Sequence, residues 1–389
     1  MAGRRVPLRE LTPVIVQADM LTPFGAGADL CFESIMAGQS AISTVNRFIT
    51  AEFTSGIAAT IKDLRYHGDT SLVMQMFERL FAASRPVIPA DSALLLATTK
   101  GEIDLLEKSL LGKGGDPADS CLDRLLTKVA SLSGATGPAV LVSAACTSSS
   151  AAVARAAAMI KGGKADSVLV VACDSVTEFI YSGFSSLMAL DTVPARPFDA
   201  ARKGLSLGEA AVFSLLMSEG RAKREGRKIL CRIAGWGMGD DANHMTGPSR
   251  QSEGLVSAIQ RALSSAAVSP GDIDLISAHG TGTSYNDEME MRAFRALFSA
   301  TTPPVYSVKG AVGHTMGSAG LLETIIAMKS LQVATVPPTV NLQCPDDDAR
   351  GWVSSEPVFL QRAKRALVTN SGFSGVNTAL VLNLPSVKA

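Results

Sequence analysis

Short apolar runs alternate with longer helical patterns along most of the chain. Runs of three to six aliphatic or β-branched residues, bounded by turn-forming residues, predict strands at 94–96, 139–142, 168–171, 273–278, 305–308 and 367–370. Apolar positions at helical spacing, or runs of alanine, predict helices that include 150–160, 255–267, 287–298 and 321–331. This alternation predicts an α/β fold with largely buried sheets.

The chain offers no linker, so we expect a single large domain built of two halves. It contains no Pro/Ser-rich tract, no long block of like charge and no low-complexity run. The most charged surface segment, 219–228, is where we place the seam. This gives an N-terminal half over residues 1–228 and a C-terminal half over 229–389. A solvated helix end explains the same segment equally well.

One stretch of the chain carries no charge at all. The 26 residues between Lys128 and Arg155 exceed the roughly 20 needed to cross a bilayer. However, two glycines and Pro138 interrupt the stretch, and eight of its residues are Ser or Thr, which argues against a membrane helix. We interpret the stretch as a buried strand, a turn and the start of a buried helix at the centre of a layered fold.

Composition narrows the class of protein. The 389 residues are 47% hydrophobic and 19% charged, and Lys plus Arg (36) balance Asp plus Glu (36). A chain of this size buries roughly 75% of its unfolded surface, so a large core is expected. Nucleic-acid binding needs an excess of clustered basic residues, and the zero net charge therefore argues against it.

The cysteines and the N-terminus indicate a reducing compartment. The six cysteines stand at positions 31, 121, 146, 173, 231 and 344. Without a CxxC pair or histidines at metal spacing, they fit neither a disulfide framework nor a zinc site, so we expect most to be reduced and buried. Charged residues near the N-terminus, including Arg4, Arg5 and Asp19, leave no room for a signal-peptide core. We expect a cytoplasmic protein.

Cys146 stands at the passage from a predicted strand to a predicted helix. Residues 139–142 predict the strand, and six alanines between 151 and 158 predict the helix. Free N–H groups and the dipole at a helix start favour an anion, so we expect a lowered thiol pKa and N–H donors for an oxyanion. This setting indicates a nucleophile, with a buried structural cysteine as the alternative. Cys173 is interpreted as a core residue.

Two of the four histidines stand in similar surroundings. His279 ends the strand 273–278 and opens a Gly-Thr-Gly-Thr turn, and His314 follows the strand 305–308 among glycines. Both positions are at strand ends, where α/β folds gather their active sites. A lone histidine near glycines is more often a loop residue, but two of them and a cysteine at a helix start favour a nucleophilic site. His67 and His244 lack this framing and are interpreted as surface or loop residues.

Several motifs carry a clear resemblance to one family. They are Ser143-Ala144-Ala145-Cys146-Thr147-Ser148, Arg196-Pro197-Phe198-Asp199, Ala278-His279-Gly280-Thr281-Gly282-Thr283, Ser307-Val308-Lys309-Gly310 through Gly313-His314, and Gly372-Phe373 through Asn377. In this order they resemble the beta-ketoacyl-acyl-carrier-protein synthases of the elongating class. The resemblance covers nearly the whole chain and implies a thiolase-like, five-layered αβαβα fold made of two related halves, usually in a homodimer.

The resemblance also implies a reaction. Cys146 would take an acyl group from a carrier-protein or coenzyme A thioester. His279 and His314 would bind the malonyl thioester carbonyl and assist decarboxylation, and the resulting carbanion would attack the acyl-cysteine to give a 3-oxoacyl thioester. No resident cofactor is implied, because phosphopantetheine arrives on the acyl carrier protein.

Supporting roles follow from the same resemblance. Lys309 corresponds to the family's supporting lysine and Glu323 to its acidic partner. Phe373 corresponds to the aromatic gate and to an oxyanion N–H donor, while Thr281 and Thr283 correspond to contacts of the pantetheine arm.

Departures from the family pattern raise a question about the substrate. Ser374 replaces a common glycine beside the gate. Leu205 replaces a common phenylalanine, and we interpret this second replacement as repacking of the core. Lys100 and Glu102 lie where fatty-acid elongating enzymes are rich in Gly and Ile near the acyl pocket. We therefore hypothesise a short, polar or unsaturated acyl chain, as in specialised polyketide or polyene pathways.

Alternatives remain on the same fold. A non-catalytic chain-length partner subunit typically lacks the active-site cysteine, a degradative thiolase needs a late Cys-x-Gly motif, and a synthase of the initiating class uses one histidine with an asparagine. A non-decarboxylating acyltransferase also remains possible.

A basic patch for the carrier protein is expected near the tunnel mouth, and its candidates by chain position are Lys62, Arg65, Lys161, Lys164, Arg202 and Lys203.

Overall fold

The computed structural model describes residues 8–385 and contains two five-stranded half-sheets with the same topology. The N-terminal half comprises β1 (Pro13–Thr22), β5 (Ala93–Ala97), β6 (Ala139–Val142), β7 (Ser167–Asp174) and β9 (Ala210–Ser218). The C-terminal half comprises β10 (Cys231–Asp240), β11 (Leu275–Ser277), β12 (Val305–Tyr306), β15 (Arg365–Ser371) and β16 (Val376–Asn383). The spatial orders, β6-β5-β7-β9-β1 and β12-β11-β15-β16-β10, match strand for strand.

The directions of the strands match as well. In each half four strands run in the same direction, and the fifth, β9 or β16, lies antiparallel between two of them. A short pairing of β1 with β10, over Val14–Arg232 and Ile15–Cys231, joins the two halves into one sheet. Two copies of a βαβαβαββ unit therefore build the protein.

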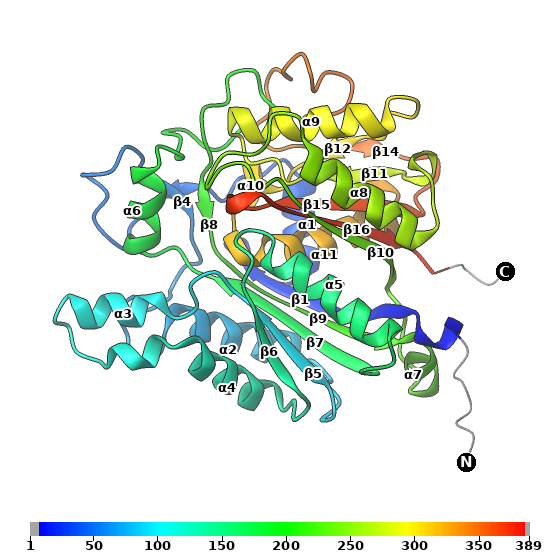
Figure 1. Cartoon of the computed structure of the whole chain (residues 1–389). Helices are drawn as coiled ribbons and strands as arrows, with labels where there is room; N and C mark the ends of the chain where they lie inside the picture. The colour runs from blue at the N-terminus through cyan, green and yellow to red at the C-terminus, as the bar shows by residue number, and fades with distance from the viewer. Residues whose placement is uncertain (1–7, 386–389) are drawn as a thin grey trace.

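Helices complete a five-layered αβαβα arrangement (Figure 1). The layering helices are α2 (Leu72–Ser84), α4 (Leu122–Ser133), α5 (Ser148–Lys161), α8 (Glu253–Ala266), α9 (Ser284–Phe298) and α11 (Ala319–Val333). Helices α5 and α11 contact each other between the two half-sheets, α2 and α4 cover the outer face of the N-terminal half, and α8 and α9 cover that of the C-terminal half. The predicted thiolase-like fold is confirmed.

Smaller elements connect these layers. The helices are α1 (Ala28–Met36), α3 (Ile103–Leu110), α6 (Glu178–Ser186), α7 (Glu219–Arg224) and α10 (Lys309–Val312). The short strands are β2 (Gly25–Ala26), β3 (Ser43–Thr44), β4 (Ile57–Ala59), β8 (Leu207–Gly208), β13 (Thr335–Val336) and β14 (Val358–Phe359). Single 3-10 turns lie at Leu8–Leu11, Pro117–Ser120, Pro270–Asp272, Met316–Ser318 and Phe373–Gly375.

Small residues allow the two central helices to approach each other closely. A Cβ added to Gly320, at the start of α11, would lie 2.8 Å from the Cβ of Ser150 on α5. Real Cβ atoms do not approach so closely, so glycine at this position sets the distance between the helices. This crossing brings the first turn of α5, which follows Cys146, against the first turn of α11.

The predicted strands and helices are confirmed, with boundaries that differ by a few residues. The long antiparallel strands β1, β9, β10 and β16 are additional. Strand β10 resembles a loop in sequence because it contains Gly235, Gly237 and Gly239. A Cβ on Gly237 would lie 2.1 Å from the carbonyl oxygen of Ala258, so these glycines let α8 pack directly on the strand.

The interpretation of the uncharged stretch is wrong in part. Burial begins at Cys146 and continues through α5, but most of residues 131–145 are exposed or half-exposed. Within residues 8–385, strand β6 is an edge strand that pairs only with β5, so one of its sides has no partner strand in the described part of the chain. The absence of charge there does not follow from burial within a single chain.

Other expectations meet the structure as follows. Segment 219–228 begins with helix α7 and ends in a turn before β10, and the division into 1–228 and 229–389 stays a prediction.

All six cysteine thiols are free. Four of them are buried, at Cys31, Cys146, Cys173 and Cys231, and two are exposed, at Cys121 and Cys344. Over residues 8–385, the helices are all too short or too polar to cross a membrane. Arg4 and Arg5 lie outside the described residues.

Candidate active site

Cys146 lies in a tight turn that hydrogen bonds hold at the start of α5. Ala145 has a φ of 48°, in the left-handed region that side chains other than glycine rarely adopt. The Thr147 hydroxyl donates to the Ala144 carbonyl (2.6 Å), and the Ser148 hydroxyl accepts the Ala144 N–H (2.8 Å). A Cβ on Gly372 would lie 3.3 Å from the Cys146 nitrogen, so glycine at this position lets the 371–373 segment approach the nucleophile.

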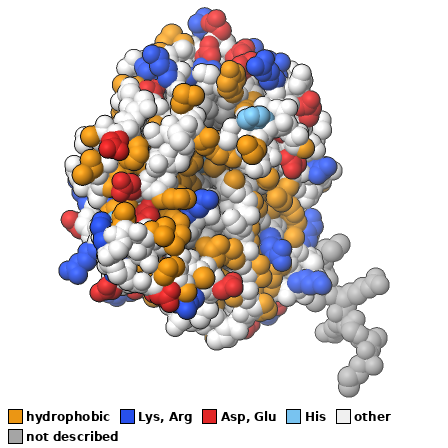
Figure 2. Space-filling model, turned by 60° about the vertical axis from the view of Figure 1, so that its left-hand side comes forward, with side chains coloured by type: hydrophobic (Ala, Val, Ile, Leu, Met, Phe, Trp, Pro, Cys, Tyr) orange, Lys and Arg blue, Asp and Glu red, His pale blue; other side chains and the backbone are white. Residues whose placement is uncertain are grey.

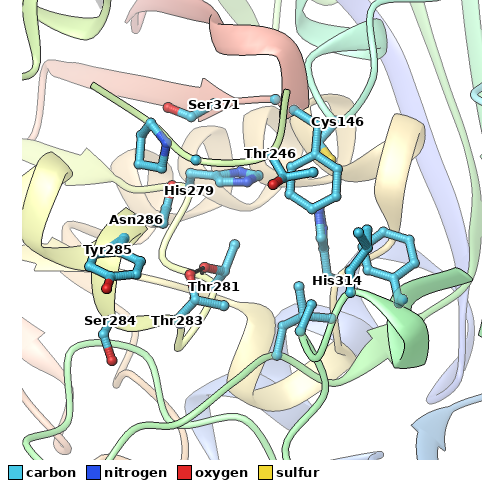
Figure 3. A pocket seen from close by; sticks show the side chains of 18 of the residues that line it. Cys146, Thr246, His279, Thr281, Thr283, Ser284, Tyr285, Asn286, His314 and Ser371 are labelled. Carbon is cyan, nitrogen blue, oxygen red and sulfur yellow. Dashed lines mark hydrogen bonds between the residues drawn. The ribbon is translucent and has the colours of Figure 1, made fainter. Parts of the chain in front are cut away.

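The two predicted histidines converge on the same cavity as Cys146 (Figure 3). His279 follows β11, and its backbone N–H donates to Glu290 (2.7 Å). His314 follows α10, and its backbone N–H donates to the Ser206 carbonyl (2.7 Å). The two rings are nearly perpendicular, at 86°, with their centroids 5.1 Å apart. Cys146 and both imidazoles line a cavity of about 470 Å³.

Lys309 lies behind His279 and fixes the state of its ring. The Lys309 ammonium is 1% exposed and lies 3.2 Å from His279 Nδ1 and 2.5 Å from Glu323 Oε1. It also donates to the His279 carbonyl, and Glu323 in turn accepts from the Asn370 amide (2.5 Å). An ammonium can only donate, so His279 Nδ1 is the acceptor and the ring proton lies on Nε2.

Burial and the Lys309 charge keep both imidazoles neutral. Burial, followed by the charge of Lys309, holds the pKa of His279 and that of His314 well below the ordinary value of 6.5. Neutral imidazoles offer N–H groups to a substrate oxygen without adding charge to the site.

The expectation of a lowered thiol pKa is wrong. Burial raises the pKa of Cys146 to about 11, although the charge of Lys309 and the backbone N–H of Phe373 act in the opposite direction. The desolvation of a sulfur anion at this buried position outweighs the effects of Lys309 and Phe373, because a buried charge loses its hydration. The thiol is therefore protonated at neutral pH and must lose its proton during the reaction.

The predicted gate residue contacts a second aromatic ring. The Phe373 ring lies 5.8 Å from that of Phe184, which lies on α6. The next residue, Ser374, has a φ of 72° and donates its N–H to the Met245 carbonyl (2.7 Å). The gate turn is thus tied to the segment 241–250, which forms part of the mouth of the cavity.

The remaining predicted site residues lie in the lining of the cavity or directly behind it. Thr281 and Thr283 line the cavity, and their hydroxyl oxygens are hydrogen-bonded to each other at 2.8 Å. Lys309 and Glu323 form the layer behind His279 and do not line the cavity. The structure brings all eight residues together, and their chemical roles stay predictions.

Three interpretations of other residues change. Leu205 lines the cavity beside Cys146 and the histidines, so its replacement of phenylalanine alters the site as well as the core. Lys100 and Glu102 do not line this cavity, and Glu102 instead pairs with Lys128 on α4 (2.8 Å). The charges at these two positions therefore give no argument about the acyl chain. His244 is exposed, as expected, but it lines the mouth of the cavity.

Most candidates for the basic patch lie elsewhere. Arg202 is only 8% exposed and pairs with Asp346 and Asp287, so it is a structural residue. Lys161 and Lys164 lie at the far end of α5, roughly 20 Å from its first turn at 1.5 Å per residue. Lys203 alone among the six candidates lines the cavity.

Two acidic residues of α9 hold the His279 turn and were not predicted from the sequence. Asp287 accepts the backbone N–H groups of Thr281 and Phe198, and Glu290 accepts those of His279 and Gly280. Both carboxyl groups are buried. Their spacing of three residues on a helix that follows the histidine turn is the signal that could have found them.

Comparisons with known proteins agree with this geometry. The family model described as "Beta-ketoacyl synthase, N-terminal domain" matches residues 125–222, and "Beta-ketoacyl synthase, C-terminal domain" matches 230–343. A "putative polyketide beta-ketoacyl synthase 1" of Streptomyces halstedii is 30% identical over 96% of this chain and 98% of its own length. The "3-oxoacyl-[acyl-carrier-protein] synthase 2" of Coxiella burnetii is 29% identical over 95% of this chain and 98% of its own length.

Solved structures are similar over the same span. The ishigamide ketosynthase/chain length factor is 27% identical, with a TM-score of 0.88 over 96% of this chain and 99% of that chain. The ketosynthase complex AntDE:AntF, with a TM-score of 0.87 over 96% of this chain and 99% of that chain, is 24% identical and supports the fold alone.

Proposed function

The chain belongs to the beta-ketoacyl synthase family, and from this premise we propose that its cavity catalyses a decarboxylating Claisen condensation. The substrates are an acyl thioester and a malonyl-acyl-carrier protein, and the product is a 3-oxoacyl-acyl-carrier protein. The observation that carries the proposal is the convergence of Cys146, His279 and His314 on one cavity, with His279 Nδ1 held by Lys309.

Acyl transfer to Cys146 is the first step. The sulfur attacks the carbonyl carbon of the acyl thioester, the bond to the carrier thiol breaks, and the cysteine proton leaves with that thiol. The backbone N–H groups of Cys146 and Phe373 are the donors for the developing oxyanion. The raised thiol pKa fits a proton that departs only as the new C–S bond forms.

Decarboxylation and condensation follow at the same cavity. The Nε2–H of His279 and an N–H of His314 donate to the carbonyl oxygen of the malonyl thioester. The C–C bond to the carboxylate breaks, carbon dioxide leaves, and the electron pair forms an enolate that the two imidazoles stabilise. The enolate carbon attacks the acyl-cysteine carbonyl, the Cys146 thiolate leaves, and a proton from water restores the thiol.

Lys309 positions His279 and does not contact the reacting atoms. Its ammonium holds Nδ1 as an acceptor, which keeps the Nε2 proton directed into the cavity, and its charge opposes protonation of the ring. Glu323 and Asn370 hold the ammonium in place. The proposed chemistry needs no resident cofactor, because the pantetheine arm arrives with the substrate.

Carrier proteins and a second subunit are the proposed partners. The solved neighbours include a complex with a type II polyketide acyl-carrier protein and pairs of a ketosynthase with a chain length factor. In this chain, the exposed uncharged residues 131–145 and the edge strand β6 form a surface suited to pairing with another subunit of the same fold. Both a homodimer and a heterodimer with a homologous partner use such an edge.

A test of the subunit contact uses the edge strand. Ala139→Lys, at the exposed first residue of β6, places a charge on the proposed interface and should shift the protein from dimer to monomer in light-scattering chromatography. Val333→Lys, at the exposed end of α11, is the matched control and should leave the mass unchanged. A wild-type protein that is monomeric, or a dimer that the Ala139 variant leaves intact, would contradict this contact.

We propose the class of pathway and the cellular compartment of the protein. The acyl chain belongs to fatty acid or to specialised polyketide or polyene biosynthesis, since relatives of both kinds are similar over nearly the whole chain. We place the protein in the cytoplasm because a nucleophilic thiol needs a reducing compartment, and all six thiols are free.

Intact mass spectrometry with an acyl-carrier protein tests the proposal. The wild type should gain the acyl mass, Cys146→Ala should not, and Cys344→Ala, which removes an exposed thiol, should behave as the wild type. Labelled malonyl-carrier protein should release carbon dioxide, and a His279→Ala/His314→Ala variant should not. Acylation without release of carbon dioxide would favour the non-decarboxylating acyltransferase, and no acylation would favour a chain-length-type subunit.

A further inference from the structure

Asp174, the last residue of β7, is a buried carboxylate that the proposed chemistry does not use. Charged side chains lie on the surface of the molecule, as Figure 2 shows for one face, whereas Asp174 is 1% exposed. Within residues 8–385 it forms no ion pair with a Lys, Arg or His side chain. It does not line the catalytic cavity, so a role in the reaction must act through other residues.

Hydrogen-bond donors from two loops surround this carboxylate. Its Oδ1 accepts the Thr98 hydroxyl (2.9 Å) and the Lys100 N–H (3.2 Å), and both oxygens accept the Thr99 N–H (3.0 Å). Its Oδ2 also accepts the Gly317 N–H, at 2.7 Å. Burial raises the pKa of Asp174, and the donors oppose this rise. The carboxylate therefore joins the end of β5 to the 3-10 turn that precedes α11.

The turn that Asp174 holds follows closely on His314. Met316, in this turn, has a φ of 52°, in the left-handed region that side chains other than glycine rarely adopt. A strained residue of this kind persists only where its surroundings hold it. A Cβ on Gly317 would lie 2.6 Å from Asp174 Oδ2, so glycine at this position admits the carboxylate. Asp174 thus fixes the backbone three residues beyond His314.

The two histidines of the site differ in how their rings are held. His279 Nδ1 accepts from a lysine ammonium (3.2 Å), whereas His314 Nδ1 has no hydrogen-bond partner in the described part of the chain. The direction of the His314 ring therefore depends on its backbone and on packing. On one side, the His314 N–H donates to the Ser206 carbonyl (2.7 Å), and its carbonyl accepts the Gly208 N–H (2.9 Å). On the other side, the buried carboxylate holds the turn that follows.

We propose that Asp174 is a positioning residue for His314, which it keeps directed at the malonyl thioester carbonyl by holding the Gly317 N–H. The inference rests on the proposed function, in which His314 acts in decarboxylation and takes no part in acyl transfer to Cys146. Loss of the contact between Asp174 and Gly317 should therefore slow the release of carbon dioxide and leave acylation of Cys146 intact. A residue needed only for folding would impair both steps together.

Asp174→Asn breaks this contact selectively. The amide oxygen can stay with the three donors of the 98–100 loop, and the amide N–H₂ then meets the Gly317 N–H, where two donors face each other. Release of labelled carbon dioxide from malonyl-carrier protein should fall roughly ten- to hundredfold at an unchanged KM, since small misplacements of a reacting group cost rates of this order.

Acylation of Cys146 is the second readout on the same variant. Intact mass with an acyl-carrier protein should show the wild-type rate, because the charge of Asp174 is among those that raise the pKa of Cys146 and its removal does not hinder the thiol. Ser167→Ala, at the other end of β7, is the matched control. It removes a buried hydrogen bond with Ser92 (2.7 Å) and should leave both rates unchanged.

Gly317→Ala tests the same contact from its other side. Its Cβ would lie 2.6 Å from Asp174 Oδ2 and 3.1 Å from the Thr99 nitrogen, so the turn must move away from the carboxylate. This variant should show the same split between the two steps. Gly183→Ala, whose Cβ meets no atom within 4 Å, should not.

Each other outcome overturns the assignment in a distinct way. Equal losses of acylation and decarboxylation, or the failure of both variants to fold, would make Asp174 a residue that supports the fold and not His314. Carbon dioxide release at the wild-type rate in both variants would remove Asp174 from the reaction and leave the proposed function standing. A wild type that is not acylated, or that releases no carbon dioxide, would overturn the proposed function and this inference with it.

Discussion

Replacing Lys309 by Met should separate the stabilising role of this residue from its role in positioning His279. Met has a similar length and no charge, so Lys309→Met leaves Glu323 buried, at 1% exposure, without its counter-ion. Breaking a buried pair by removing one partner costs about 3–5 kcal/mol. With an unfolding entropy of about 2.1 cal/mol/K per residue, the 389-residue chain has about 0.8 kcal/mol/K, so the melting temperature should fall by roughly 4–6 °C.

The double variant Lys309→Met/Glu323→Gln removes both charges and keeps an amide oxygen for Asn370. It should regain most of the lost stability, because no uncompensated charge remains. It should not regain the release of carbon dioxide from malonyl-carrier protein, because His279 Nδ1 has lost its donor and the ring can adopt either tautomer. Calorimetry and labelled carbon dioxide release measure the two effects. A double variant that decarboxylates at the wild-type rate would refute the positioning role, and a single variant that melts at the wild-type temperature would refute the buried pair.

Three further predictions concern the support of the two histidines. Glu290→Gln places an amide N–H₂ opposite the backbone N–H of either His279 or Gly280, and should lower the free energy of unfolding in urea by about 1–3 kcal/mol. An unchanged urea midpoint would contradict these two hydrogen bonds. Gly208→Ala places a Cβ 2.1 Å from a backbone carbonyl two residues before His314 and should reduce decarboxylation, whereas Gly183→Ala meets no atom within 4 Å and should not. Because the pKa of each histidine is held well below 6.5, the unfolded chain takes up protons first as pH falls, so stability should decrease below about pH 6.5, and less steeply in a His279→Gln/His314→Gln variant.

The candidate site was largely predictable because each of its parts has a local signature. A cysteine between an apolar strand and an alanine-rich helix, and two histidines among glycines at strand ends, are patterns that sequence spacing displays. Lys309 and Glu323 could be assigned only through the family resemblance. The acidic residues that hold the histidine turn were missed, because a buried Glu on a helix resembles an ordinary surface position in sequence.

Properties that depend on the surroundings of a residue could not be predicted from its neighbours in sequence. Burial in the layered fold raises the pKa of Cys146 to about 11, and this desolvation exceeds the opposing effects of the Lys309 charge and the Phe373 N–H. Leu205, Lys100 and Glu102 were misjudged because their roles depend on which side of a strand end faces the cavity. The three glycines of β10 concealed a strand that pairs with β1 and β16 and on which α8 packs.

The sequence alone determined the alternation of the shorter parallel strands with helices, the two-half organisation that we predict and the candidate reactive groups, since all of these follow from local patterning and side-chain chemistry. The tertiary structure alone decided which ionisation states those groups adopt, which charges meet at the mouth, and where uncharged surface remains exposed. Desolvation and charge proximity depend on atoms that are distant in the chain. The uncharged stretch before Cys146 illustrates the difference: its composition suggested the centre of the fold, whereas much of it is exposed or half-exposed at the edge where β6, among residues 8–385, pairs only with β5.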